Sequence, residues 1–224
     1  GGTHGKTTTT SMIASVLDNA DFDPTVINGG IINAYNTNAR KGSSDWMVVE
    51  ADESDGTFLK LPSTVVIVTN IDPEHLDFYG NFKKLKEAFV QFIDNIPFYG
   101  FALICIDNST NQSLMSEITD RRVITYGLSP QADIRATDLE ITSKGTKFTL
   151  EISPRIDTPT KKVENLFSTI PGRHNVQNVL AACATTFELG VPIDSIKASL
   201  RNFQGVKRRF SIIKNVDNIK VIDD

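Results

Sequence analysis

The chain has 224 residues, enough for one large domain or two small ones with a substantial buried core. Its hydrophobic fraction of 40% and charged fraction of 22% are those of an ordinary globular protein, and a net charge of −4 gives no global attraction to nucleic acid. No apolar run reaches the ~20 residues that span a bilayer and no signal peptide is present, so we expect a cytoplasmic protein with neither a membrane nor a nucleic-acid partner.

The first stretch, GGTHGKTTTT, is a glycine-rich turn leading into a helix that we expect from about Lys6 to Asn19. Such a turn directs unpaired backbone N–H groups and the positive end of a helix dipole at one point, where a polyphosphate can bind. In the usual phosphate loop, four residues separate the first glycine from Gly-Lys-Ser/Thr. Here only Thr3 and His4 separate Gly2 from Gly5-Lys6-Thr7. Met12, Ile13, Val16 and Leu17 fall on one face of the helix.

Each residue type in this loop has a specific use. Gly2 and Gly5 carry no side chain, so a polyphosphate can approach the backbone. Lys6 would place its ammonium on the β- and γ-phosphates, and the hydroxyl of Thr7 would complete a Mg²⁺ shell. The structural alternative is a glycine turn before a capped helix with Lys6 in solvent.

Three apolar runs then predict strands covered on both faces: 46–51, 64–70 and 101–106. Between the last two, residues 81–96 place apolar side chains at helical spacing. This strand, helix, strand rhythm predicts an α/β fold of the phosphate-loop type, with a mostly parallel sheet flanked by helices over the first ~130 residues.

The pattern changes at about residues 133–170, where alternation predicts an additional antiparallel section. It is clearest at Phe148, Leu150 and Ile152, after a turn at Lys144-Gly145. Helix returns from Asn175, with a buried stripe and a stop at Gly190, and Asp194 is expected to cap a shorter helix. The stripe consists of Val176, Val179, Leu180, Cys183 and Phe187. Residues 211–224 predict one more strand or hairpin. Both cysteines, Cys105 and Cys183, are expected to be buried, reduced thiols.

Acidic and histidine side chains follow two of these strands. Glu50 ends the first, and a carboxylate there needs a cation or strong donors; Asp52 to Asp55 could equally form a solvated acidic loop. His75 follows the next strand, and a lone histidine is more often structural than a ligand. Because parallel strands end at one sheet edge, Thr7, Glu50 and His75 could converge to hold two divalent cations around a triphosphate.

Two later stretches carry further polar groups. In PGRHNVQN, His174 and Asn178 share one helical face, and Asn175 either caps the helix or reads a purine edge; chemistry alone favours neither. In the basic stretch 207–210, Arg209 is either solvated surface or a group that neutralises charge developing during phosphoryl transfer.

Together these motifs resemble the Mur ligase family, the ATP-dependent amide-forming enzymes of peptidoglycan precursor synthesis. The loop GTHGKTTT is similar to that family's phosphate loop, and the stretches EADESDGTF, VTNIDPEHLDFYGNF, NIPFYG, PGRHNVQN and FQGVKRRF look most like the member that adds L-alanine to UDP-N-acetylmuramate. The resemblance spans nearly the whole chain.

The resemblance implies roles for individual residues. Lys6 and the loop amides, from Gly2, Thr3, His4 and Gly5 to Thr7 and Thr8, would hold the phosphates of ATP. Thr7 and Glu50 would ligate one Mg²⁺ and His75 a second. Adenine would contact His174, Asn175 and Asn178, ATP phosphate would contact Arg209, and the ribose would be held by Asp224. Residues 29–42, and Glu53 to Asp55, would face the sugar nucleotide.

The resemblance also implies a reaction and a domain organisation. The carboxylate of UDP-N-acetylmuramate would attack the γ-phosphate of ATP to give an acyl phosphate, which the amine of L-alanine then attacks. Residues 1–209 would be the central ATP-binding domain and 210–224 the start of a C-terminal domain, so we expect this chain alone to be inactive. Several relatives carry a carbamylated lysine; that position falls near Phe89 here, and Lys84 and Lys86 are weak substitutes.

Two other functions remain as alternatives. Folylpolyglutamate synthase is a related amide ligase with a different acid substrate, for which the EADESD stretch is not expected. A phosphate-loop GTPase or regulatory nucleotide-binding module would lack ligation chemistry. GTPases read guanine through an Asn-Lys-x-Asp motif, which this sequence lacks, so adenine is favoured.

Overall fold

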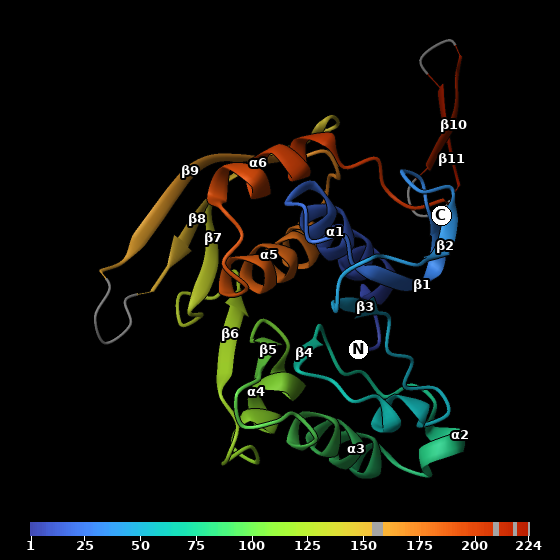
Figure 1. The fold of residues 1–224 in the computed structure, drawn as a ribbon, viewed down its shortest axis with the longest axis vertical. Coiled ribbons are helices and arrows are strands. Elements are labelled where there is room, and N and C mark those ends of the chain that lie inside the picture. Colours follow the sequence, from blue (N-terminus) through green and yellow to red (C-terminus); the bar gives the residue numbers. More distant parts are fainter. Residues whose placement is uncertain (154–158, 208–210, 217–218, 224) are drawn as a thin grey trace.

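The computed structural model describes residues 1–153, 159–207, 211–216 and 219–223, and the last two ranges by their backbone alone. Its largest sheet has six strands (Figure 1), of which neighbours β4 to β7 are parallel and β7 to β9 antiparallel. In sheet order they are β4 (Val65–Val68), β5 (Phe101–Cys105), β6 (Val123–Gly127), β7 (Ile134–Thr142), β8 (Gly145–Ile152) and β9 (Lys161–Ser168). The predicted parallel sheet with an antiparallel section is confirmed.

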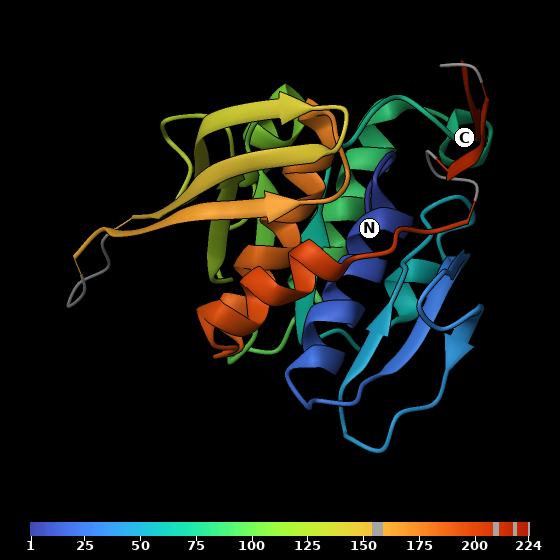
Figure 2. The ribbon, with the colours of Figure 1, turned by 90° about the horizontal axis from the view of Figure 1, so that it is seen from above.

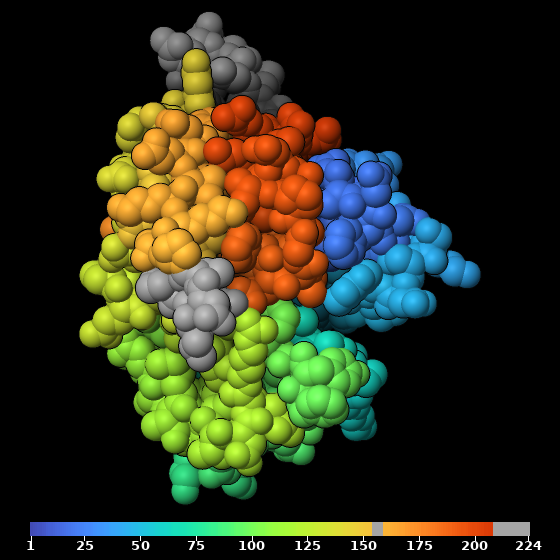
Figure 3. All heavy atoms as spheres, turned by 60° about the vertical axis from the view of Figure 1, so that its left-hand side comes forward, coloured from blue at the N-terminus to red at the C-terminus, as the bar shows by residue number. Residues whose placement is uncertain are grey.

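Helices cover both faces of this sheet because the parallel strands are apolar on both sides. One face packs against α1 (Lys6–Asn19), α5 (Arg173–Glu188) and α6 (Ile193–Asn202), and the other against α3 (Phe82–Asp94), α4 (Ser109–Met115) and the short 3₁₀ helix η1 (Thr57–Lys60). Figure 2 shows the three antiparallel strands side by side, with α6 next to β9. In Figure 3, α6 fills the space between β9 and the end of α1.

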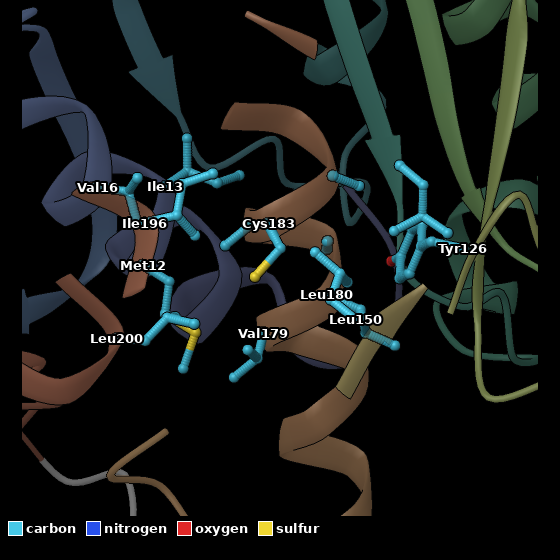
Figure 4. Packing of buried hydrophobic residues seen from close by; sticks show 14 of the residues in the cluster. Met12, Ile13, Val16, Tyr126, Leu150, Val179, Leu180, Cys183, Ile196 and Leu200 are labelled. Atoms are coloured by element: carbon cyan, nitrogen blue, oxygen red, sulfur yellow. The ribbon is translucent and has the colours of Figure 1, made fainter. Parts of the chain in front are cut away.

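The larger core lies between the sheet and the helices α1, α5 and α6 (Figure 4). Met12, Ile13 and Val16 meet Ile196 and Leu200 there, with side chains of α5 between the helices and the strands. All four apolar residues predicted for the buried face of α1 are buried. The α5 stripe is also confirmed, although Phe187 at its end is only partly buried.

Strand β5 divides its side chains between two cores. Phe101, Leu103 and Cys105 point to the larger core, whereas Ala102 and Ile104 belong to the second core under α3. The second core includes Phe89, which is fully buried with its ring centroid 5.3 Å from that of Phe58.

Both cysteines are reduced and buried. Burial raises the pKa of the Cys105 and Cys183 thiols to about 12, so neither forms a thiolate near neutral pH.

A separate three-stranded sheet corrects the prediction for residues 46–51. Its order is β2 (Thr37–Arg40), β1 (Thr25–Ile32), β3 (Met47–Val49), with β3 parallel to β1. Strand β3 is therefore not hydrogen-bonded to β4, and it is not covered on both faces, since Met47 is 57% exposed. A run of three apolar residues is too short to identify its sheet partner.

The remaining predictions concern the later part of the chain. The hairpin expected after residue 210 is present as β10 (Ser211–Val216) and β11 (Ile219–Asp223), which pair only with each other among the described strands. Gly190 follows Leu189, the C-cap residue of α5, with a φ of +83°, as predicted for its stop. Asp194 does not cap α6: Pro192 is the N-cap residue, and Asp194 lies within the first turn. None of the helices in the described ranges is long and apolar enough to cross a membrane.

A carboxylate in the antiparallel section gives the fold a pH dependence. Glu151 is 7% exposed and bonds to Lys162 and Arg135 from the strands on either side. Lys162, followed by Arg135, lowers the pKa of Glu151. The stabilisation of the folded state by these two ion pairs is therefore complete above the ordinary glutamate pKa of about 4.3. It is lost as the pH falls through the lower pKa that Glu151 has in the folded protein.

We expect Glu151→Gln to lower the free energy of unfolding by about 1 kcal/mol at pH 7 and by less at pH 3.5, because the stabilisation begins to be lost below the ordinary glutamate pKa of about 4.3. Urea unfolding at both pH values measures this. Glu140→Gln is the control, because Glu140 forms an exposed pair with Lys147 at 3.6 Å. An equal loss at both pH values would contradict the assignment.

Candidate nucleotide and cation site

The phosphate loop, residues 1–5, is bound to the chain that follows β4. Thr3 N donates to the carbonyl oxygen of Asn70 at 2.9 Å, and His4 N donates to the Asn70 side chain at 2.8 Å. The Thr69 hydroxyl donates to the His4 carbonyl at 2.6 Å, and Asp72 N donates to the Thr3 hydroxyl. These bonds fix the backbone of the loop before any ligand is bound.

Two glycines make this loop geometry possible. Gly2 has a φ of +130°, and a Cβ there would lie 2.2 Å from the Thr69 hydroxyl and 2.9 Å from the Asn70 carbonyl oxygen. Gly5 is the N-cap of α1 in the left-handed region, and a Cβ there would lie 2.3 Å from the Asn178 side chain. The backbone therefore approaches its neighbours closely, and the N-terminus of α1 opens toward a cavity.

Lys6 makes an ion pair with a buried acid. Its ammonium lies 3.0 and 2.9 Å from the two carboxylate oxygens of Glu53, whose side chain is 2% exposed. His75 Nε2 lies 3.9 Å from the same carboxylate. His75 precedes α2 (Leu76–Tyr79) in the left-handed region, with a φ of +55°. The structure thus places Lys6, Glu53 and His75 in one cluster.

Thr7 and Glu50 form a neighbouring pair. The Thr7 hydroxyl donates to Glu50 Oε1 at 3.0 Å, and Gly29 N donates to the other carboxylate oxygen at 2.6 Å. Glu50 lies one residue past β3 and is half-buried. A hydroxyl and a carboxylate side by side are hard oxygen donors of the kind Mg²⁺ prefers, so the predicted pair fits this cation.

Other ligands would have to complete such a shell. The described residues contain no group of three or more His, Cys, Asp or Glu side chains arranged around a metal position. A cation at Thr7 and Glu50 would therefore need water or phosphate oxygens, as is usual for nucleotide-bound Mg²⁺.

The phosphate loop opens into a cavity of about 710 Å³. Glu50 lines it on one side and the start of α5 on the other, so two of the sequence motifs meet the loop there. His174 is exposed, whereas Asn175 and Asn178 are buried. The lining residues are Thr3, His4, Gly5, Lys6, Thr7, Thr8, Glu50, Ile141, Ile170, Pro171, Gly172, His174, Asn175, Asn178 and Val206.

The asparagines at the start of α5 are bonded to each other and to the loop helix. Asn178 accepts from the Thr9 hydroxyl at 3.3 Å and donates to Asn175, and Asn175 in turn donates to the Pro171 carbonyl at 2.8 Å. Asn175 does not act as the helix cap: Gly172 is the N-cap residue, and no side chain caps this helix. The two asparagines thus form a bonded cavity wall beside α1.

The rest of the cavity wall is apolar. Ile141 reaches it from β7 and is 49% exposed, and Ile170 and Val206 complete this side. Val206 belongs to the segment 204–207, which runs alongside β1: Asn33 N donates to the Gly205 carbonyl, and Lys207 N donates to the Ile31 carbonyl at 2.9 Å. The cavity therefore combines a phosphate-binding end with an apolar side large enough for a planar base.

Some predicted residues lie elsewhere. His75 does not line the cavity and instead faces Glu53. Arg209 and Asp224 fall outside the described residues. His4 lines the cavity, and its Nε2 lies 3.6 Å from the carboxylates of Asp72 and Glu74.

Glu53 is the residue whose place the sequence did not reveal. Its neighbours Asp52 and Asp55 are exposed, as an acidic loop would be, but Glu53 is buried. Spacing alone does not distinguish these acids. The one available signal was the position of Glu53 shortly after a strand that ends beside the phosphate loop.

The family model of the Mur ligase middle domain matches residues 1–186. The chain belongs to the Mur ligase family. The match includes the phosphate loop, Glu50, His75 and the start of α5, so the cavity-lining residues other than Val206 fall within the family's domain.

Individual Mur ligases are similar over the entire chain. UDP-N-acetylmuramate–L-alanine ligases from Bartonella quintana and Methylorubrum extorquens are 58% and 57% identical to it, with 100% of this chain covered in both alignments. The alignments cover 47% and 48% of those two proteins, so the chain spans about half the length of these curated relatives.

Solved structures support the same fold. UDP-N-acetylmuramate-alanine ligase MurC from Thermotoga maritima superimposes with a TM-score of 0.83 at 32% identity, covering 100% of this chain and 49% of that one. A point mutant of L. casei FPGS, a folylpolyglutamate synthase, reaches a TM-score of 0.78 at 13% identity over 100% of this chain and 66% of that one, which shows a shared fold only.

Proposed function

We propose that this chain is the ATP-binding part of an enzyme that joins L-alanine to UDP-N-acetylmuramate. The observation that carries the proposal is the cavity of about 710 Å³, in which the phosphate loop, Glu50 and the start of α5 meet. The relatives named for this reaction share 54–58% identity with the chain over its whole length.

The reaction requires a carboxylate to be activated and then transferred to an amine. An oxygen of the UDP-N-acetylmuramate carboxylate attacks the γ-phosphorus of ATP. The bond between the γ-phosphorus and the oxygen that bridges it to the β-phosphate breaks, ADP departs, and an acyl phosphate is formed. The nitrogen of L-alanine then attacks the acyl carbon and expels inorganic phosphate. Such a transfer depends mainly on positioning and on charge neutralisation.

Residues of this chain would supply both the positioning and the positive charge. Lys6 and the N–H groups of the loop, from Gly2, Thr3, His4 and Gly5 to Thr8, would bind the β- and γ-phosphates. Thr7 and Glu50 would hold one Mg²⁺, and His75 would help to hold a second cation. When bound, these ions neutralise negative charge on the phosphates. Arg209 would add a further positive charge.

The base and ribose would bind beyond the phosphates. His174, Asn175 and Asn178 would contact adenine, whose apolar faces fit beside Ile141 and Val206. Asp224 would hold the ribose.

We assign residues 1–209 to the ATP-binding domain and 210–224 to the start of the next domain. Residues 29–42 would lie on the side that receives the sugar nucleotide, and the whole protein would work in the cytoplasm. Alone, this chain would bind ATP–Mg²⁺ weakly and form little or no product.

A hybrid protein tests the proposal. Residues 1–224 replace the matching segment of the Bartonella quintana ligase, and product formation is measured with ATP, Mg²⁺, UDP-N-acetylmuramate and L-alanine. We expect ATP-dependent alanine ligation, with GTP a poor substitute. Glutamate addition to a folate would favour the folylpolyglutamate synthase alternative, and nucleotide hydrolysis without ligation would favour a simple nucleotide-binding module.

A further inference from the structure

The buried ion pair of Lys6 and Glu53 has a consequence for nucleotide binding. Both carboxylate oxygens of Glu53 are within 3.0 Å of the Lys6 ammonium, and the two side chains are 2% and 15% exposed. A buried carboxylate is stable only with a positive partner or strong donors. A triphosphate bound at the loop attracts the Lys6 ammonium, and this movement takes away the partner of Glu53.

A second group is already beside Glu53. His75 Nε2 lies 3.9 Å from Glu53 Oε1 and is half-exposed, so it is open to an incoming ion. The position of Glu53 is fixed independently, because the Tyr79 hydroxyl donates to its backbone carbonyl. His75 adopts a left-handed conformation that a residue other than glycine seldom takes, and this turn directs its ring toward Glu53.

We propose that Glu53 and His75 together hold a divalent cation, and that Lys6 blocks this position until a nucleotide attracts its ammonium. Two ligands about 2.1 Å from one ion are roughly 3–4 Å apart, which matches the observed separation of 3.9 Å. A carboxylate oxygen with an imidazole nitrogen suits Mn²⁺ better than Mg²⁺, which prefers oxygen alone. The buried negative charge of Glu53 is thereby balanced in both states: by Lys6 without nucleotide, and by the cation with it.

This proposal deepens the proposed function, on which it rests for the role of the nucleotide, but it has a test that needs neither ATP nor ligation. Lys6→Met removes the ammonium and keeps an apolar stem, so Glu53 becomes available in the nucleotide-free chain. We expect this variant to bind Mn²⁺ at least about 10-fold more tightly than Lys6→Met/Glu53→Gln. Wild type and Glu53→Gln should bind Mn²⁺ equally, because Lys6 blocks the site in the wild type. Titrations followed by the electron paramagnetic resonance signal of free Mn²⁺ measure the Mn²⁺ affinity of all four proteins.

Three further measurements test whether Glu53 and His75 themselves bind the cation. Pulsed electron paramagnetic resonance of Mn²⁺ bound to Lys6→Met should show coupling to an imidazole ¹⁴N that His75→Ala abolishes. The matched control Lys6→Met/Asp52→Asn, which changes an exposed acid in the same loop, should keep the tight binding. Circular dichroism checks folding, and Lys6→Gln replaces Lys6→Met if that variant is unfolded. Equal Mn²⁺ affinity with and without Glu53 in the Lys6 variants, or no ¹⁴N coupling, would overturn the proposal.

Discussion

Lys6→Ala is expected to weaken ATP binding by about 100-fold, because it removes a charge-assisted bond to phosphate in a partly buried site. The substitution has a second effect, since Glu53 loses the partner that lies 2.9 Å away in a buried position. We therefore expect the free energy of unfolding to fall by about 3 kcal/mol as well. Isothermal titration with ATP–Mg²⁺ and urea unfolding measure the two effects separately.

The double variant Lys6→Ala/Glu53→Gln distinguishes a direct role in binding from a loss of stability. Removing the unpaired charge should restore most of the stability but none of the affinity for ATP. Lys60→Ala is the control for the loss of a positive charge, because Lys60 is exposed at the end of η1. Recovery of ATP binding in the double variant would show that Lys6 acts only by holding the fold together.

Gly2→Ala is expected to abolish detectable nucleotide binding and to destabilise the protein by about 3 kcal/mol or more. The new Cβ would lie 2.2 Å from the Thr69 hydroxyl and 2.9 Å from a backbone oxygen of Asn70, and a rotamer change of Thr69 relieves only the first contact. The loop would have to move away from the chain after β4, and the N–H groups that face the cavity would move with it.

Gly80→Ala provides a matched control for this effect. Gly80 has a φ of +78°, but a Cβ there meets nothing within 4 Å, so the substitution introduces backbone strain without a collision. We expect it to cost about 1 kcal/mol and to leave ATP binding unchanged. If both alanine variants lose the same stability and both bind ATP, close packing at Gly2 is not what shapes the loop. Thermal unfolding and ATP titration of the two variants decide this.

Sequence patterns were sufficient where one local signal determined the structure. The apolar face of α1 identified that helix and its buried side, and the alternation at Phe148, Leu150 and Ile152 identified a strand and its apolar side, although Glu151 on the opposite side is buried as well. The meeting of the phosphate loop with Glu50 followed from the general rule that ligands bind at the carboxyl ends of parallel strands, although His75, expected there by the same rule, does not line the cavity. The place of the start of α5 beside them was expected only from the family resemblance.

The patterns were insufficient where the outcome depended on contacts between distant residues. Glu53 differs from Asp52 and Asp55 only because Lys6 and Tyr79 happen to reach it, which no local spacing records. The short β3 run fitted a sheet with β4 as well as it fitted one with β1. At α6, the residue expected to cap the helix lies inside it, because Pro192 takes the N-cap position and the helix already begins at Ile193.

The side chains of β5 point alternately into the two cores, and this links the stability of the layers on either side of the sheet. Phe101, Leu103 and Cys105 anchor the layer of α1, which begins at the phosphate loop, while Ala102 and Ile104 anchor the layer of α3. Neither layer can detach without exposing a strand that the other one needs. The two halves of the site, one on α1 and one ahead of α3, are therefore parts of a single cooperative folding unit rather than of two independently fluctuating ones.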